Sequence, residues 1–250
     1  FTYYHFKMNK LIFKLFYSKL DLPLFFLIIA MLLSGCLQIT GKAIQQIPTE
    51  TAKEPEIYFC PGEDCSRVFE TSIKSANSTV HCAFYDIDLK NMISSLAEKS
   101  KIIDVRLVMD SSNYKEQIKG DGIKLDDNGQ LMHNKFCIID DSTLITGSFN
   151  PTDNDNNYNN NNVIVVYSST LARNYEDEFN ELWDGKFGKG SNVKNPIFYI
   201  NNMKIENYFC PEDKCASRII DLIKNAGSSI YFMSFSFTNE EIADALIMNG

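Results

Sequence analysis

The sequence has little positive charge and lacks the motifs of several large enzyme classes. Its 250 residues carry 24 Lys+Arg against 32 Asp+Glu, a formal net charge of −8. Nucleic-acid binding depends heavily on basic side chains that neutralise phosphates, so this balance disfavours a protein that coats nucleic acid, although a local basic groove stays compatible with it. The chain has no Walker, Rossmann or zinc-hydrolase motif. The classes that depend on those motifs are therefore excluded.

Histidine is scarce, with three in the chain. His5 and His81 have no ligand-like companions nearby. Asp86 and Asp88 could resemble a metal pair, but carboxylates at a strand end are more simply solvated. The sequence therefore predicts no metal site and no cofactor. The third histidine is His133.

The N-terminal region also lacks a hydrophobic run long enough to span a membrane. Leu24–Leu33 has ten apolar residues, whereas a membrane-spanning helix needs about 20. The run follows three lysines and ends at Leu-Ser-Gly-Cys36, which is similar to a bacterial lipobox. We expect residues 1–36 to be a signal peptide with Cys36 lipidated, or alternatively an uncleaved membrane anchor. Either reading places the rest of the chain outside the cytoplasm and close to a membrane.

Residues 37–56 are polar, contain two prolines and lack a clear amphipathic period. They are typical of a linker. Removing the four lysines and one aspartate of residues 1–35 leaves 20 basic and 31 acidic residues, a formal charge of −11.

An internal repeat organises the remaining chain. Residues 58–80 and 208–230 share nine of 23 positions at an offset of 150, including Tyr-Phe-Cys-Pro at the start of each copy. Such a repeat indicates two copies of one structural unit. We expect a first domain over 57–200 and the beginning of a second, incomplete copy over 201–250.

Hydrophobic patterns in the first copy alternate between strand and helix. We expect helices at 66–76, 89–99 and 171–183, and strands at 79–85, 105–109, 138–141, 142–146 and 163–167, with polar loops between them. The second copy predicts a helix at 217–225 and a strand at 230–237. Alternation of this kind predicts an α/β fold, a mixed sheet flanked by helices on both faces.

Four of the seven cysteines form two pairs at equal spacing, Cys60/Cys65 and Cys210/Cys215. Outside the cytoplasm, two local disulfides are the favoured interpretation. A shared four-cysteine zinc site is the alternative. Cys82 and Cys137 lie in apolar strand-like runs and read as small buried side chains, although a disulfide between them is also compatible with the sequence.

The segment 133–150, HNKFCIIDDSTLITGSFN, carries the most chemistry. It places six residues in the order H-x-K, four residues, D, six residues, G-S-x-N: His133, Lys135, Asp140, Gly147, Ser148 and Asn150. Side chains two apart share one face of a strand, so His133 should lie beside Lys135, and Ser148 beside Asn150. The pattern predicts a nucleophile, a cation and two hydrogen-bonding groups that converge on one anion.

This pattern resembles the phospholipase D superfamily, the HKD phosphodiesterases. The resemblance implies that His133 attacks phosphorus without a metal and forms a phosphohistidine. Lys135 and Asn150 would hold the non-bridging oxygens, with support from Ser148 and from Gly147. Asp140 completes the catalytic motif, but strand alternation predicts that it faces away and orients or braces its neighbours.

The chain departs from the nuclease-type members of this family at one position. Those members usually carry N-x-E-N after G-S-x-N, and the Glu hydrogen-bonds the catalytic histidine. Here the stretch is Asn159–Asn162, with Asn161 at the Glu position. An amide can accept a hydrogen bond but cannot stabilise an imidazolium by charge. The asparagine-rich run around it is expected to be a polar loop.

The resemblance also implies that one active site needs two motifs. At the offset of 150 the second would fall near position 283, so the sequence is expected to be the front part of a two-copy enzyme, or else a chain that pairs as a homodimer. The leading hypothesis is an extracytoplasmic, membrane-anchored phosphodiesterase acting on phospholipid or nucleic acid. A nuclease-type homodimeric endonuclease and a catalytically inactive phosphate-binding module are the alternatives.

Overall fold

The computed structural model describes residues 46–116 and 118–249, and the fold described is that of the unit Ile47–Gly250. The predicted signal peptide or anchor and the lipidation site Cys36 lie outside the described residues. Within the described ranges, no helix combines the length and the apolar character needed to cross a bilayer.

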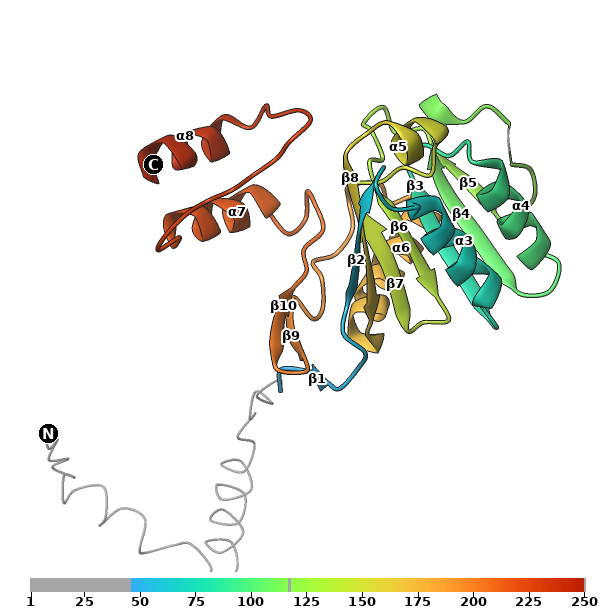
Figure 1. Cartoon of the computed structure of the whole chain (residues 1–250), viewed down its shortest axis with the longest axis horizontal. Coiled ribbons are helices and arrows are strands. Elements are labelled where there is room, and N and C mark those ends of the chain that lie inside the picture. Colours follow the sequence, from blue (N-terminus) through green and yellow to red (C-terminus); the bar gives the residue numbers. More distant parts are fainter. Residues whose placement is uncertain (1–45, 117, 250) are drawn as a thin grey trace, which may run out of the picture. The chain divides into compact units, whose positions relative to one another are not determined.

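The centre of the unit is a seven-stranded mixed sheet (Figure 1). Neighbouring strands follow the order β2-β8-β7-β6-β3-β4-β5. β3, β4 and β5 are parallel, and the other neighbours are antiparallel. The strands span β2 Glu56–Cys60, β3 Thr79–Phe84, β4 Asp104–Asp110, β5 Ile123–Asp126, β6 Lys135–Ile139, β7 Thr143–Gly147 and β8 Asn161–Tyr167.

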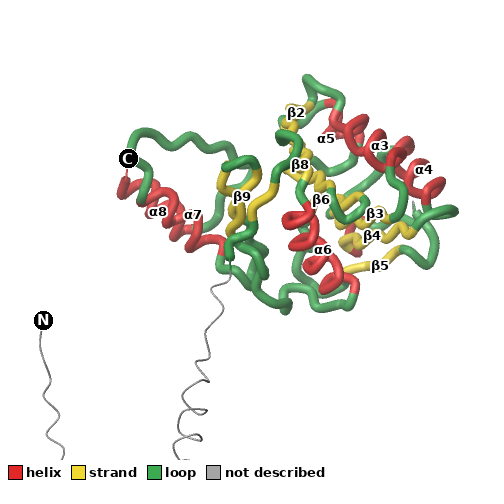
Figure 2. The backbone as a smooth tube through the Cα atoms, turned by 90° about the horizontal axis from the view of Figure 1, so that it is seen from below, coloured by secondary structure: helices red, strands yellow, loops and turns green. Residues whose placement is uncertain are grey.

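Helices cover both faces of this sheet, as the sequence predicts. Helices α3 (Cys65–Ser75) and α4 (Lys90–Lys99) lie on one side of the strands, and α6 (Ser169–Trp183) lies on the other (Figure 2). The core is divided in the same way. Val80, Cys82 and Phe84 of β3 face the cluster that holds Phe69 and Met92, whereas Ala83 faces the cluster that holds Phe179. Burying both faces explains why the central strands read as apolar runs rather than as alternating ones.

Short elements flank the main sheet. β1 (Thr49–Glu50), β9 (Ile197–Ile200) and β10 (Met203–Glu206) form a separate three-stranded sheet. Glu50 also accepts hydrogen bonds from the Ser168 hydroxyl and the Thr170 backbone near the start of α6. Residues 49–56, part of the stretch expected to be a linker, therefore belong to this fold.

The second copy repeats the first in its local structure. α7 (Cys215–Lys224) and α8 (Glu240–Asn249) correspond to α3 and α4 at the offset of 150, and they pack against each other. The strand expected at 230–237 is absent, so that prediction is wrong. Tyr231 and Phe235 are almost fully exposed there, because no neighbouring strand among the described residues pairs with this segment.

Six of the seven cysteines form disulfides: Cys60–Cys65, Cys82–Cys137 and Cys210–Cys215. The two local bridges agree with the favoured prediction, and they leave no thiols for the four-cysteine zinc alternative. Cys82 and Cys137 are fully buried, as the sequence predicts, and they form the disulfide that the sequence left open as the alternative. They face each other across β3 and β6 with their Cα atoms 4.1 Å apart, close enough for a bridge.

Candidate active site

His133 and Lys135 lie at the end of the sheet where β3 and β4 finish and β6 begins. Lys135 is the first residue of β6 and pairs with Phe84, the last residue of β3. His133 was expected on the same strand face, but it lies in the segment just before β6. Its position is therefore set by loop contacts rather than by strand alternation.

Two residues that the sequence did not single out for the site hold this loop. Asp110, at the end of β4, is buried and accepts a hydrogen bond from the backbone N–H of Met132 at 2.9 Å. The backbone N–H of Tyr85 donates to the carbonyl oxygen of Asn134 at 3.0 Å. The Tyr85 ring then meets the His133 imidazole edge to face, with ring centroids 4.7 Å apart. A signal for Asp110 was available, since an acidic residue directly follows the apolar run of β4.

His133 is biased toward its neutral form. Burial lowers the pKa of its imidazole, the nearby Lys135 cation lowers it further, and Asp110 opposes both. A neutral imidazole has a free lone pair on one ring nitrogen, whereas an imidazolium has none. The site therefore keeps His133 in the form that can attack an electrophile.

Lys135 is a cation held largely out of water, with 9% of its surface exposed. Its ammonium donates to the carbonyl oxygen of His133 at 3.1 Å and lies 5.3 Å from the centroid of the Tyr85 ring. Burial lowers the pKa of Lys135 to about 8, although Asp155 and Asp86 act in the opposite direction. A cation with few protein partners at a site edge is suited to binding an anion.

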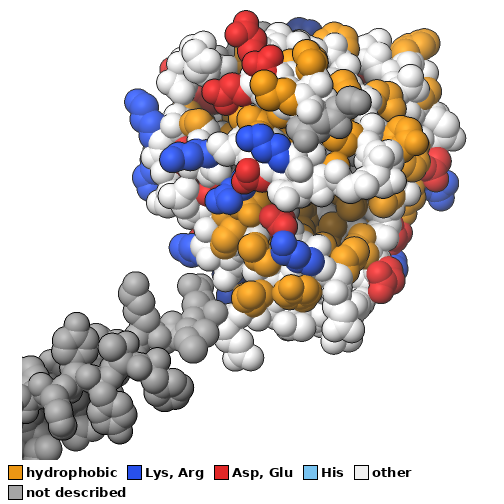
Figure 3. All heavy atoms as spheres, turned by 90° about the vertical axis from the view of Figure 1, so that its left-hand side faces the viewer, with side chains coloured by type: hydrophobic (Ala, Val, Ile, Leu, Met, Phe, Trp, Pro, Cys, Tyr) orange, Lys and Arg blue, Asp and Glu red, His pale blue; other side chains and the backbone are white. Residues whose placement is uncertain are grey.

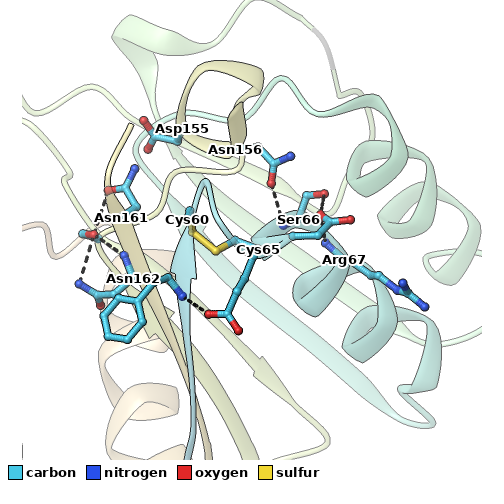
Figure 4. Close-up of a disulfide and its surroundings, with 12 residues drawn as sticks. Cys60, Cys65, Ser66, Arg67, Asp155, Asn156, Asn161 and Asn162 are labelled. Atoms are coloured by element: carbon cyan, nitrogen blue, oxygen red, sulfur yellow. Dashed lines mark hydrogen bonds between the residues drawn. A yellow bond between two sulfur atoms is a disulfide. The ribbon is translucent and has the colours of Figure 1, made fainter. Parts of the chain in front are cut away.

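Asn150 and Ser148, which the sequence predicts on one strand face, hydrogen-bond to different partners. The Asn150 backbone N–H and side-chain amide both donate to Asp155, at 2.8 and 2.9 Å. The Ser148 hydroxyl instead donates to Asn161 Oδ1 at 2.9 Å and accepts from the backbone N–H of Asn162 at 3.0 Å (Figure 4). β7 ends at Gly147, so alternation no longer applies beyond that residue. Asn161, which departs from the Glu that the family resemblance implies, accepts the hydrogen bond of the Ser148 hydroxyl.

Gly147 permits a close approach between two strands. Its φ is +149°, and a Cβ there would lie 2.2 Å from the carbonyl oxygen of Asn162. No side chain can occupy that space without moving the backbone of β8. The glycine therefore supports the turn that carries Ser148 and Asn150.

Asp140 lies at the opposite end of β6 from the motif histidine and braces the loop before β3. Its carboxylate accepts hydrogen bonds from the backbone N–H groups of Asn77, Ser78 and Thr79 at 2.7–3.1 Å. Burial raises the pKa of this carboxyl, but those N–H groups outweigh it and lower the pKa to about 2. Asp140 is thus outside the cluster of His133 and Lys135, in the bracing position that strand alternation predicts.

A cavity of about 870 Å³ adjoins His133 and Lys135 on the α6 side of the sheet. Its wall includes Glu178, whose pKa is raised to about 7 by burial first and then by the neighbouring Glu212, Glu181 and Asp213. Much of the remaining wall is apolar or aromatic: Leu131, Met132, Phe136, Tyr175, Leu182, Phe187, Tyr208, Phe209 and Pro211. This cavity could not be predicted from the sequence, because its wall joins residues from both repeat copies.

No group of three or more His, Cys, Asp or Glu side chains within residues 46–116 and 118–249 is arranged to hold a metal ion. The motif itself supplies an imidazole, an ammonium, an amide and a hydroxyl.

The profile of the family described as "Cardiolipin synthase, PLD-like domain" matches residues 69–183, which include the whole motif. Residues 69–183 therefore form a phospholipase D-like domain. Phospholipase D of Rickettsia conorii is 28% identical over 127 residues, which cover 47% of this chain and 63% of that protein. Mitochondrial cardiolipin hydrolase of Chlamydomonas reinhardtii is 30% identical over 121 residues, covering 44% and 53%.

Among solved structures, the phospholipase D family member Nuc from Salmonella typhimurium is similar with a TM-score of 0.47 and 22% identity, covering 53% of this chain and 96% of Nuc. The chain spans somewhat less than two thirds of the length of most of the Rickettsia phospholipase D proteins that it matches.

Proposed function

We propose that this protein hydrolyses phosphodiester bonds through a covalent phosphohistidine at His133. The observation that carries the proposal is a neutral, partly buried imidazole beside the buried Lys135 ammonium. The imidazole nitrogen would bond to phosphorus while the bond to the leaving oxygen breaks, and Lys135 would stabilise the charge that develops on the non-bridging oxygens. A water molecule would then attack phosphorus, break the P–N bond and release the phosphoryl product.

Both steps need a second proton-transfer group. The leaving alkoxide must receive a proton and the attacking water must lose one, and a second histidine suits both tasks at neutral pH. We propose that a second motif supplies it, either from further residues of the same polypeptide or from a second copy of this chain.

The proposed substrate class is phospholipid. The apolar part of the cavity wall beside His133 suits an acyl or glyceryl group better than a charged polynucleotide. One face of the molecule also favours this choice, because its Lys and Arg side chains are interspersed with acidic and hydrophobic ones (Figure 3). The names of several relatives, phospholipase D and cardiolipin hydrolase, point the same way.

The location is a further part of the proposal. Three disulfides among the described residues support an oxidising compartment outside the cytoplasm. Residues 1–36 would then act as a signal peptide with lipidation at Cys36, or as an anchor, and would bring the site close to its lipid substrate.

The test of activity uses bis(p-nitrophenyl) phosphate, with His133→Ala as the matched variant. We expect turnover by the parent protein and none above background in the variant. Binding of inorganic phosphate without turnover would instead support the phosphate-binding module. A parallel assay on phosphatidylcholine vesicles and single-stranded DNA decides the substrate class, and turnover of DNA alone would overturn the phospholipid proposal.

A further inference from the structure

We infer that Asp155 is a positioning residue of this site, one that orients the Asn150 side chain and balances the charge of Lys135. The effect of Asp155 on catalysis rests on the proposed function, phosphodiester hydrolysis at His133. Asp155 lies in α5 (Asp153–Asn157), a short helix inside the asparagine-rich run that the sequence analysis expected to be a loop. Neither its sequence context nor the motif singles it out.

The first observation is the number of donors around a buried carboxylate. Asp155 is 7% exposed. One carboxylate oxygen accepts from the backbone and side-chain N–H groups of Asn150, and the other accepts from the Asn159 side-chain amide at 2.7 Å. These hydrogen bonds hold the Asp155 carboxylate in one orientation, because any other orientation would leave buried N–H groups without an acceptor.

The second observation concerns the orientation of Asn150. Since the Asp155 carboxylate accepts hydrogen bonds, the group it binds must be the NH2 of the Asn150 amide. The amide oxygen Oδ1 therefore points the other way. That oxygen is buried and has no hydrogen-bond partner within the described part of the chain. Asp155 thus fixes the Asn150 amide with its oxygen as a buried acceptor that no described residue satisfies.

The third observation links Asp155 to the motif cation. Lys135 contacts the Tyr85 ring and the His133 carbonyl, and it is influenced by the charges of Asp155 on α5 and Asp86 after β3. Asp155 raises the pKa of Lys135 more than Asp86 does, and both carboxylates favour the charged ammonium. Without it, burial would act on Lys135 with only Asp86 in opposition.

The helix that carries Asp155 is fixed at several points. The Thr152 hydroxyl caps its start by accepting from the Asp155 backbone N–H at 3.2 Å. The backbone N–H of Asp153 donates to Asp88 at 2.7 Å. On the far side, Asn156 accepts from the backbone N–H of Ser66 at 3.0 Å, next to the Cys60–Cys65 disulfide (Figure 4). In that view Asn156 points toward Ser66, whereas Asp155 points away from the disulfide.

The test measures the protonation of Lys135 directly and needs no turnover. The lysines are dimethylated with ¹³C-formaldehyde, and the Lys135 signal is assigned by its loss in Lys135→Arg. Asp153→Asn is the matched control, because it removes an exposed carboxylate from the same helix. We expect the Lys135 signal to titrate at lower pH in Asp155→Asn than in the parent protein, and at the parent pH in Asp153→Asn.

An unchanged Lys135 titration in Asp155→Asn would overturn the inference. Asp155→Ser serves as a second charge-free variant if Asp155→Asn does not fold, and the same fall is expected. Where the parent protein turns over a phosphodiester, the ratio of parent to Asp155→Asn kcat/KM should rise with pH, up to tenfold for each unit by which the Lys135 pKa falls. Absence of turnover in the parent protein would count against the proposed function, whereas the NMR titration would still decide the role of Asp155.

Discussion

His133 and Lys135 set opposite limits to the pH range in which this site can work. The attacking imidazole must be neutral, and burial lowers its pKa, so the acid limit lies below the ordinary histidine range. The ammonium must be charged, and burial lowers its pKa to about 8. Burial of both side chains therefore extends the working pH range toward acid through His133 and shortens it toward alkali through Lys135.

The first prediction concerns the alkaline limit. We expect kcat/KM to fall as pH rises through about 8, because Lys135 loses its proton there. Lys135→Arg keeps its charge over the whole assay range, so the fall attributable to this residue should disappear even if the absolute rate is lower. A pH profile of the two proteins checks this, and an unchanged alkaline limit in Lys135→Arg would assign it to another group.

The second prediction concerns Asp110. Its carboxylate opposes the lowering of the His133 pKa and accepts the Met132 N–H. Asp110→Asn should therefore lower the pKa of His133 further. NMR titration of the imidazole signals measures this in a chain with three histidines. A His133 pKa that stays the same or rises would contradict the assigned contact.

The third prediction concerns stability through Asp140. The folded-state pKa of about 2 lies below the ordinary value of 3.8. A group with a depressed pKa stabilises the fold above its unfolded value, and this stabilisation is lost as pH falls from about 4 through 2. Asp140→Asn should therefore cost about 2 kcal/mol in the free energy of unfolding at pH 7 and much less at pH 2. Urea unfolding at both pH values checks this, and activity per folded molecule should remain near that of the parent.

At the scale of elements, the turn after β7 depends on a glycine. Gly147→Ala should destabilise the fold by about 2 kcal/mol or more, because the new Cβ would meet the Asn162 backbone at a positive φ. Gly129→Ala is the control, since Gly129 also has a positive φ but has open space around its Cβ position. Urea unfolding of the two variants separates the steric cost of the new Cβ from the cost of placing alanine at a positive φ. Equal losses of stability in both variants would contradict the close approach of Gly147 to β8.

The main elements could be predicted because their patterns are strong. The buried strands β3, β4, β6, β7 and β8 and the helices α3, α4 and α6 match the expected segments within a few residues. The prediction missed β5, which is short and pairs only with β4 at the sheet edge. It also missed α5, because asparagine-rich sequence disfavours helix and this helix depends on the Thr152 cap and on tertiary hydrogen bonds.

The site could be predicted only in part. The spacing of His133, Lys135 and Asn150 indicated an anion site and its chemistry. It did not indicate Asp110, Tyr85 or Asp155, since these come from separate elements that meet only in the folded sheet. The expected placement of Ser148 and Asn150 on one strand face stays a prediction, since β7 ends at Gly147 and the two side chains bind different partners.

At the scale of the whole molecule, the Cys82–Cys137 disulfide joins two central strands that are 55 residues apart in sequence. Closing a loop of that length restricts the unfolded chain and stabilises the fold by about 4 kcal/mol in the chain-entropy account. Cys82→Ala with Cys137→Ala should therefore lower the free energy of unfolding far more than Cys60→Ala with Cys65→Ala, whose loop spans five residues. Equal losses in urea unfolding would contradict this account.

The repeat recurs only in part among the described residues. The second copy has the disulfide spacing of the first and both of its helices, but the segment that corresponds to β3 is unpaired and exposes Tyr231, Phe232 and Phe235. In the first copy, the equivalent strand is completed by β4 on one side and β6 on the other. Strand structure at 230–237 therefore depends on partners that the described residues do not supply.

The most direct test of the central claim is to trap the covalent intermediate. The protein is mixed with a phosphodiester substrate and quenched in alkali, where a phosphohistidine survives, and the peptide that contains His133 is analysed by mass spectrometry. The account predicts a phosphoryl adduct on His133 in the parent protein and neither adduct nor turnover in His133→Asn. Turnover that proceeds without an adduct on His133, or that persists in His133→Asn, would contradict it.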